Sequence, residues 1–248
     1  MQIRTCVDRN LLQGYMNNVD MTMYPVKLDN CTYKKYCAYL KFHLIKYLRV
    51  SALCALAVAL AGCSDEQKLP ELAPEATILA FGDSLTAGKG VSVSNAYPAV
   101  LQKILSRNVV NSGISGETTS EGLSRLPGVL DKENPDLLLL LEGGNDILRN
   151  QDLAATKRNL SAMIQLAKQR DIPVVLIGVP KKSLLGKTAG FYFELAEEHE
   201  IPLQDTIIGK LLRDQSMKSD SVHFNTKGYA ALAQALADLL REQGAIGQ

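Results

Sequence analysis

The chain has 248 residues, of which 46% are hydrophobic, so it is long and apolar enough to bury a sizeable core. Residues 1–63 hold eight of the 27 basic and three of the 26 acidic side chains, which leaves 19 basic and 23 acidic side chains in residues 64–248. This acidic balance, without a Lys or Arg cluster, argues against nucleic-acid binding. All five cysteines lie at or before position 63, which excludes disulfides and cysteine metal ligands from the rest of the chain.

A basic start at residues 47–49 precedes an apolar run of about 12 residues, too short to span a bilayer but suited to a signal peptide. The run ends in Leu60-Ala61-Gly62-Cys63, which resembles the lipobox of bacterial lipoproteins. That resemblance implies that Cys63 becomes a lipid-modified N-terminus. An ordinary apolar helix with a chance cysteine is the alternative.

We therefore interpret residues 45–62 as a lipoprotein signal peptide and residues 63–76 as a polar tether. Residues 1–44 show no clear apolar period, and we interpret them as a mis-assigned N-terminal extension. The acyl chains of a lipoprotein would anchor the exported protein to a bacterial membrane, facing the periplasm. Ser64, directly after Cys63, is not the acidic residue that commonly retains lipoproteins at the inner membrane. By this resemblance the outer membrane is favoured over the inner membrane, and Asp65 leaves the choice open.

From residue 77 onward, short apolar runs alternate with longer amphipathic segments. The expected strands are 77–81, 108–111, 136–144, 173–179 and 201–204, and the expected helices are 95–107, 119–133, 152–171, 188–200 and 226–244. This alternation predicts one α/β domain over residues 77–243, a three-layer α/β/α arrangement with a mostly parallel five-stranded sheet.

The first three predicted strands end in unusual sequences. These are Gly82-Asp83-Ser84, "NSGISGET" at 111–118 and "EGGND" at 142–146. Loops after parallel strands lie at one edge of the sheet, so we expect the three to converge. A phosphate-binding loop is disfavoured, because no GxxxxGK[ST] is present and residues 88–90 lack the third glycine of a dinucleotide fingerprint.

Only two histidines follow residue 64. His199 lies in a charged segment and is interpreted as a solvated surface residue. His223 follows Asp220 by three residues, so Asp220 could accept a hydrogen bond from Nδ1 and leave Nε2 free to take a proton from a serine. A surface turn explains this pair equally well.

Together, "GDSL" at 82–85, "SGISGET", "GGND" and D-x-x-H resemble the GDSL or SGNH hydrolase family over about residues 76–242. The resemblance implies a flavodoxin-like SGNH fold and a serine ester hydrolase that needs no cofactor. It implies a Ser84, His223 and Asp220 triad and an oxyanion hole made by Ser84, Gly113 and Asn145. The usual D-G-x-H-P is not met at Ser221 and Phe224, which puts the shape of that loop in doubt.

Other acids have structural interpretations. We expect Asp83 to brace its turn and Asp146 to orient the Asn145 loop, while Glu142 is either a buried partner or a strand end. A metal site built from Asp83, Asp146 and Asp220 is an alternative, since oxygen ligands suit Mg²⁺. Such a metal site would give no functional role to Ser84, Gly113 and Asn145.

The resemblance is nearest to small exported esterases described as arylesterase, thioesterase or lysophospholipase, which implies a small-molecule or lipid ester substrate and a monomer. Residues 147–153 and 180–191 are expected to line an acyl groove, the second as a flap or a plain surface loop. A carbohydrate O-deacetylase is an alternative, which the absence of Trp disfavours. A non-catalytic lipid-anchored binding or assembly protein is another, and it would predict a damaged triad.

Overall fold

The structure is a computed structural model that describes residues 69–182 and 186–247. The predicted extension, signal peptide and lipidated Cys63 lie outside these residues, as do Leu184 and Leu185 of the predicted flap. Among the described residues, no helix is both long enough and apolar enough to cross a membrane.

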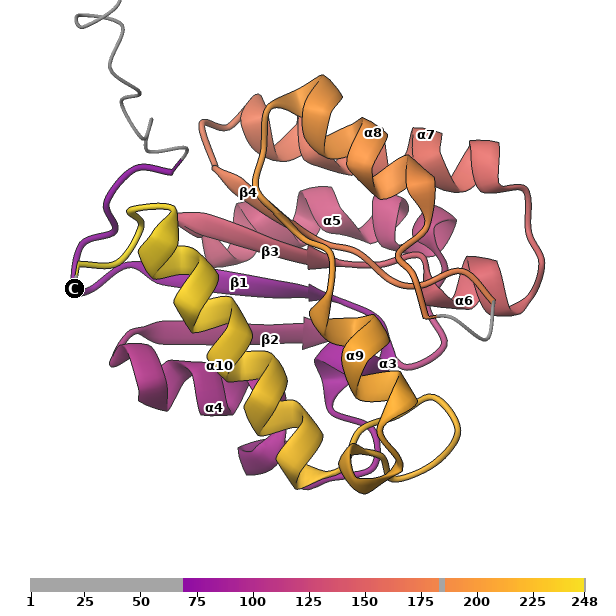
Figure 1. Cartoon of the computed structure of the whole chain (residues 1–248). Helices are drawn as coiled ribbons and strands as arrows, with labels where there is room; N and C mark the ends of the chain where they lie inside the picture. Colours follow the sequence, from indigo (N-terminus) through magenta and orange to yellow (C-terminus); the bar gives the residue numbers. More distant parts are fainter. Residues whose placement is uncertain (1–68, 183–185, 248) are drawn as a thin grey trace, which may run out of the picture. The chain divides into compact units, whose positions relative to one another are not determined.

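Five parallel strands form one sheet in the order β2-β1-β3-β4-β5 (Figure 1). The strands are β1 (Thr77–Gly82), β2 (Asn108–Gly113), β3 (Leu137–Leu141), β4 (Val174–Ile177) and β5 (Leu203–Gln204). Their order places β1 and β3 in the interior of the sheet. All five leucines of β3 are fully buried, as expected for a central parallel strand covered on both faces.

Helices cover both faces of this sheet, with α4 and α10 on one side and α5, α7 and α8 on the other (Figure 1). Their bounds are α4 (Tyr97–Leu105), α5 (Thr119–Glu133), α7 (Leu153–Lys168), α8 (Gly190–His199) and α10 (Thr226–Glu242). The predicted α/β/α architecture is therefore confirmed.

The last helix shows why its sequence folds in this way. Asn225 is its N-cap and accepts a hydrogen bond from the Gly228 N–H at 3.1 Å. A buried stripe at helical spacing, Tyr229, Leu232 and Leu236, then faces the core. This cap also fixes the loop just before the helix, which carries His223.

Three short helices at the carboxyl edge of the sheet were not expected. They are α3 (Ser84–Ala87), α6 (Gly144–Leu148) and α9 (Ile207–Arg213). Two of them begin inside the loops that the sequence analysis singled out. Their first turns leave backbone N–H groups without partners inside the helix.

The domain is longer at both ends than predicted. Leu69 and Leu72 are buried, and the Leu72 N–H donates to the carbonyl of Ala245 at 2.8 Å. Residues 69–76 therefore pack against the domain rather than forming a free tether, because they cover apolar surface near the end of α10. Ala245 and Ile246 are buried beyond the predicted boundary at 243.

Candidate active site

Ser84 lies two positions after the end of β1, as the first residue of α3. A Cβ on Gly82 would meet the Leu141 carbonyl oxygen at 2.2 Å, so only glycine allows β1 to lie this close to the end of β3. Asp83 caps α3, with its Oδ1 accepting the Leu85 N–H at 2.9 Å. The strand end and the cap together fix the serine at the sheet edge.

His223 reaches Ser84 from the opposite end of the domain. Its Nε2 lies 3.0 Å from Ser84 Oγ and its Nδ1 lies 2.7 Å from Asp220 Oδ2. The other oxygen of Asp220 accepts the backbone N–H groups of Val222 at 2.9 Å and His223 at 2.8 Å. The loop is thereby held in the shape that aims the imidazole at the serine, although it departs from D-G-x-H-P.

The electrostatics set the direction of proton transfer. The Val222 N–H, together with the hydrogen bond from His223, lowers the pKa of Asp220 to about 2. An ionised Asp220 accepts a hydrogen bond from the Nδ1–H of His223. In the neutral imidazole this leaves Nε2 without a proton, as an acceptor for the serine hydroxyl. The arrangement is that of a nucleophile, a base and an orienting carboxylate.

Two N–H donors lie beside the serine. The Asn145 amide nitrogen donates to the Glu117 carbonyl at 2.8 Å, and it lies 3.5 Å from Asp83 Oδ2. The amide is thus held mainly by the neighbouring loop and only weakly by Asp83, and Asn145 lines the pocket beside Ser84. The Ser84 N–H is in the first turn of α3 and has no acceptor within that helix.

The structure corrects the expected role of Gly113. Gly113 ends β2, and its N–H donates to Asn111 Oδ1 at 3.0 Å, so this N–H is occupied. A Cβ there would meet the Ala87 nitrogen at 2.1 Å, which makes Gly113 a packing residue under α3. Gly116, three residues later, lines the same pocket as Ser84, Asn145 and His223.

Gly116 lies in the loop between β2 and α5. Its φ is +86°, a conformation that glycine adopts freely, and its carbonyl accepts the Arg149 guanidinium at 2.8 Å. No group among the described residues accepts a hydrogen bond from its N–H. "SGISGET" contains two glycines, and only the three-dimensional path of the loop distinguishes them.

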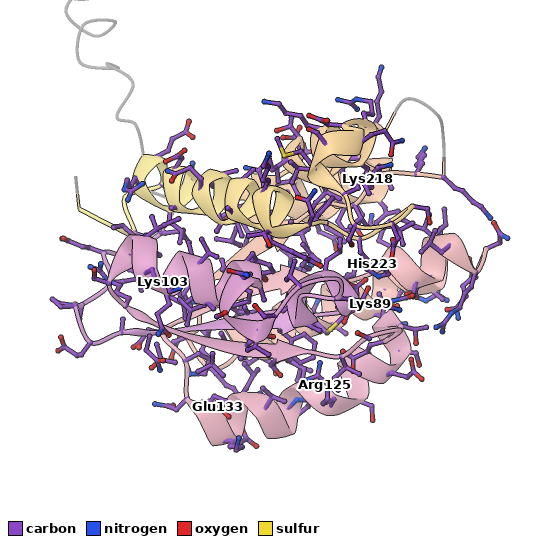
Figure 2. The ribbon with its side chains drawn as sticks, turned by 90° about the horizontal axis from the view of Figure 1, so that it is seen from below. Lys89, Lys103, Arg125, Glu133, Lys218 and His223 are labelled. Atoms are coloured by element: carbon purple, nitrogen blue, oxygen red, sulfur yellow. The ribbon has the colours of Figure 1, made fainter. Side chains whose placement is uncertain are left out.

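An ion pair that sequence analysis missed supports this loop. Arg125 of α5 binds Glu117 through two nitrogens, at 2.8 and 2.5 Å, and also bonds Ser112 Oγ at 2.7 Å. Its guanidinium lies 4.0 Å from the ring centre of Phe81. Arg125 therefore ties the end of β2, the loop before α5 and β1 together beneath the site (Figure 2).

The remaining acids brace the site. Asp146 accepts hydrogen bonds from the Thr119 N–H at 3.0 Å and from the Thr119 hydroxyl at 2.6 Å, which links the Asn145 loop to α5.

Glu142 is completely buried, and burial, with repulsion by Asp83, raises its pKa to about 11. Burial therefore favours the neutral form of Glu142, whose Oε1 accepts no hydrogen bond from the described residues. Burial, followed by repulsion from Glu117 and Asp146, also raises the pKa of Asp83.

The metal-site alternative finds no support. Within residues 69–182 and 186–247, no three or more His, Cys, Asp or Glu side chains gather as metal ligands. Asp83, Asp146 and Asp220 instead bind backbone and side-chain donors.

His199 is not the solvated residue that was expected. It is 7% exposed, and its Nε2 lies 2.8 Å from Ser161 Oγ on α7. Phe191, Leu195 and His199 follow one another at four-residue spacing and lie on the buried face of α8. His199 therefore joins α8 to α7 and takes no part in the constellation around Ser84.

The site opens into a pocket of about 980 Å³. Its walls come from α3, α6, α9 and the segment after β4. Residues of both predicted groove segments line it, among them Leu148, Pro180 and Lys181.

Comparison with known proteins adds family information to this geometry. The sequence matches the GDSL-like Lipase/Acylhydrolase family over residues 80–231. It is 34% identical over 173 residues to the thioesterase 1/protease 1/lysophospholipase L1 of Escherichia coli K12, covering 66% of this chain and 83% of that protein. It is 39% identical over 128 residues to esterase TesA of Pseudomonas aeruginosa, covering 50% of this chain and 64% of that protein, which is less than two thirds of its length.

A solved structure shows the same fold. The crystal structure of AlinE4, an SGNH-hydrolase family esterase, aligns with a TM-score of 0.53 and 32% identity. The alignment covers 69% of this chain and 97% of that one.

Proposed function

The chain belongs to the GDSL-like Lipase/Acylhydrolase family, and we propose that it is a serine ester hydrolase that works through an acyl-enzyme on Ser84. The observation that carries this proposal is the continuous hydrogen-bond chain from Ser84 Oγ through His223 to Asp220, at 3.0 and 2.7 Å. This chain opens onto the pocket, where an ester can reach the serine.

In the proposed first step, Ser84 Oγ attacks the ester carbonyl carbon while Nε2 of His223 takes the hydroxyl proton. The carbonyl oxygen becomes an oxyanion that receives hydrogen bonds from the N–H groups of Ser84 and Gly116 and from the Asn145 amide. The tetrahedral intermediate then collapses, the C–O bond to the alcohol breaks, and His223 returns the proton to the leaving oxygen.

The second step repeats this chemistry with water. His223 accepts a proton from a water molecule, which attacks the acyl-Ser84 carbonyl. The acid is released, and the proton returns to Ser84 Oγ. Asp220 stays ionised throughout and stabilises the imidazolium that forms in each step.

The direct test is hydrolysis of p-nitrophenyl esters of increasing acyl chain length by the purified domain. We expect turnover that disappears in Ser84→Ala. If the wild-type domain folds but cleaves none of these esters nor the matching thioesters, the proposal is wrong, and the non-catalytic alternative replaces it. Acetylated sugars in the same assay test the O-deacetylase alternative.

We also propose that Cys63 carries a lipid anchor that holds the protein at the outer membrane, facing the periplasm. The support is the lipobox-like "LAGC" after a short apolar run. In this account Cys63→Ala gives an unanchored or unprocessed protein with an intact catalytic domain. Recovery of that variant in carbonate-washed membranes would contradict the anchor.

A further inference from the structure

Glu142 is a buried carboxyl group that the proposed mechanism does not use. It follows the last residue of β3, and the Tyr192 hydroxyl of α8 donates to its backbone carbonyl at 2.6 Å. Its Oε2 accepts the N–H of Gly143 at 3.3 Å, whereas no group among the described residues donates a hydrogen bond to Oε1. An ionised Glu142 would therefore be a buried charge with an unsatisfied oxygen, which is costly.

The cation nearest to this edge of the sheet is occupied by another acid. Arg125 directs two nitrogens to the carboxylate of Glu117 and a third to Ser112 Oγ. Within residues 69–182 and 186–247, no ion pair involves Glu142. No positive charge thus offsets the burial of Glu142 as an anion.

Glu117 is the acceptor that a neutral Glu142 can reach. Glu142 Oε1 and Glu117 Oε2 both face Gly122 of α5, at 3.6 and 3.7 Å from the point where a Cβ on that glycine would lie. A protonated carboxyl group has an O–H to donate, whereas two ionised carboxylates only repel each other. Burial first, then repulsion by Asp83 and the hydrogen bond with Glu117, raise the pKa of Glu142.

Glu117 connects this pair to the reacting atoms. It comes directly after Gly116, the proposed backbone donor to the oxyanion, and its own carbonyl accepts the Asn145 amide at 2.8 Å. Its N–H donates to the Ile114 carbonyl at 3.2 Å, which closes the turn that contains Gly116. A displacement of Glu117 would therefore move the backbone on which two of the three proposed oxyanion donors depend.

We propose that Glu142 is a positioning residue for the oxyanion hole: as a neutral acid it donates a hydrogen bond to Glu117 and so holds the loop that carries Gly116. The inference rests on the proposed ester hydrolysis, in which the donors of this loop act on the transition state. Arg125 fixes the Glu117 carboxylate from one side and Glu142 fixes it from the other. Among the described residues, those that line the pocket do not include Glu142, so its effect on substrate is indirect.

The test compares two substitutions that differ in whether they can donate a hydrogen bond. Glu142→Met has a similar length and no polar hydrogen. We expect it to lower kcat on a p-nitrophenyl ester about 10-fold with KM nearly unchanged, since a displaced oxyanion donor costs less than a deleted one. Glu142→Gln has an amide N–H that can donate to Glu117, and it should restore most of this loss. Activity is expressed per folded molecule, with the folded fraction taken from circular dichroism.

Two further variants separate positioning from general stability. Leu137→Val removes buried packing at the other end of β3 but no hydrogen bond, so it should lower stability and keep kcat. In a Glu117→Gln background, Glu142→Met should cost little more kcat, because the residue through which Glu142 acts is already altered.

Three outcomes overturn the inference. The first is a kcat that Glu142→Met leaves unchanged. The second is an equal loss of kcat in Glu142→Gln and Glu142→Met. The third is an effect of Glu142→Met that is as large in the Glu117→Gln background as in the wild type. Each of these would leave Glu142 as a residue that only fills the core.

Failure of the hydrolase proposal is distinguishable from failure of this inference. An active wild type with an equally active Glu142→Met keeps the hydrolase and removes the role of Glu142. If the folded wild type cleaves no ester, NMR of the Asn145 side-chain amide decides the inference instead. Its resonances should move in Glu142→Met and stay in place in Glu142→Gln. Resonances that stay in both variants, or move equally in both, contradict the inference.

Discussion

At the residue scale, the proposed chemistry depends on three side chains that come from opposite ends of the domain. Ser84 follows the first strand, whereas Asp220 and His223 precede the last helix, 139 positions from serine to histidine. The caps Asp83 and Asn225 fix the two loops that bring these groups together.

We expect Ser84→Ala and His223→Ala each to abolish most turnover, and the double variant to be little worse than either alone. The reason is that the proton transfer needs both partners, so losing one removes the contribution of the other. kcat/KM on a single ester measures this. His199→Ala is the matched control: it should keep its activity per folded molecule but lose stability, because His199 is buried against Ser161.

We expect Asn145→Ala to lower kcat by roughly 10²–10³ with little change in KM, since an oxyanion donor acts mainly in the transition state. Steady-state kinetics on the same ester gives both constants. An unchanged kcat would show that the amide only braces the Glu117 carbonyl, which it also contacts.

The proximity of Ser84, His223 and Asp220 was predictable from sequence, because each of these residues lies in a short motif. The residues that support this cluster were not predictable. Gly113 and Gly116 sit in one motif, and only the hydrogen bond from Gly113 to Asn111 shows which N–H is occupied. The burial of His199 was indicated by its four-residue spacing from Leu195, which is itself four residues from Phe191. The charged residues next to His199 obscured this pattern. The Glu117 to Arg125 pair spans a loop and two helical turns, a separation for which no local pattern exists.

At the element scale, the carboxyl edge of the sheet is organised by helix starts rather than by open loops. α3 begins two positions after the end of β1, and α6 begins three positions after the end of β3. Ser84 and Asn145 therefore lie on helical backbone. Such short helices have too few residues to show an apolar period, which is why the sequence predicted strand and loop there. Regular backbone holds the donors more rigidly than a loop would.

Arg125→Met tests how α5 supports this edge. Glu117 is only 3% exposed, so the variant leaves a buried carboxylate unpaired, at a cost of about 3–5 kcal/mol in the free energy of unfolding. We also expect a lower kcat, since Gly116 loses its neighbouring anchor. Urea denaturation and kinetics measure the two effects. Lys132→Met removes an exposed ion pair of the same helix and should change neither by much.

At the scale of the whole molecule, a buried acid makes stability depend on pH. The pKa of Glu142 is raised from 4.5 to about 11 in the folded domain, first by burial and then by Asp83. Between these values the unfolded chain releases a proton that the folded domain keeps. Unfolding is therefore favoured as pH rises, by up to about 1.4 kcal/mol per pH unit for this group.

Glu142→Gln should remove this dependence, because an amide resembles the protonated acid and does not ionise. We expect the free energy of unfolding of the variant to fall less between pH 6 and pH 9 than that of the wild type. Urea titrations at the two pH values measure it. The exposed Glu197→Gln on α8 is the control and should follow the wild type; equal slopes for all three proteins would mean that Glu142 is ionised when folded.

The central claim is that Ser84 is the nucleophile and His223 its base. Mass spectrometry after treatment with a fluorophosphonate tests it most directly, because the reagent phosphonylates activated serines. We expect a single adduct on the peptide that contains Ser84, and almost none in His223→Ala. An adduct on another serine, or an unlabelled Ser84 in a protein that still hydrolyses esters, would contradict it.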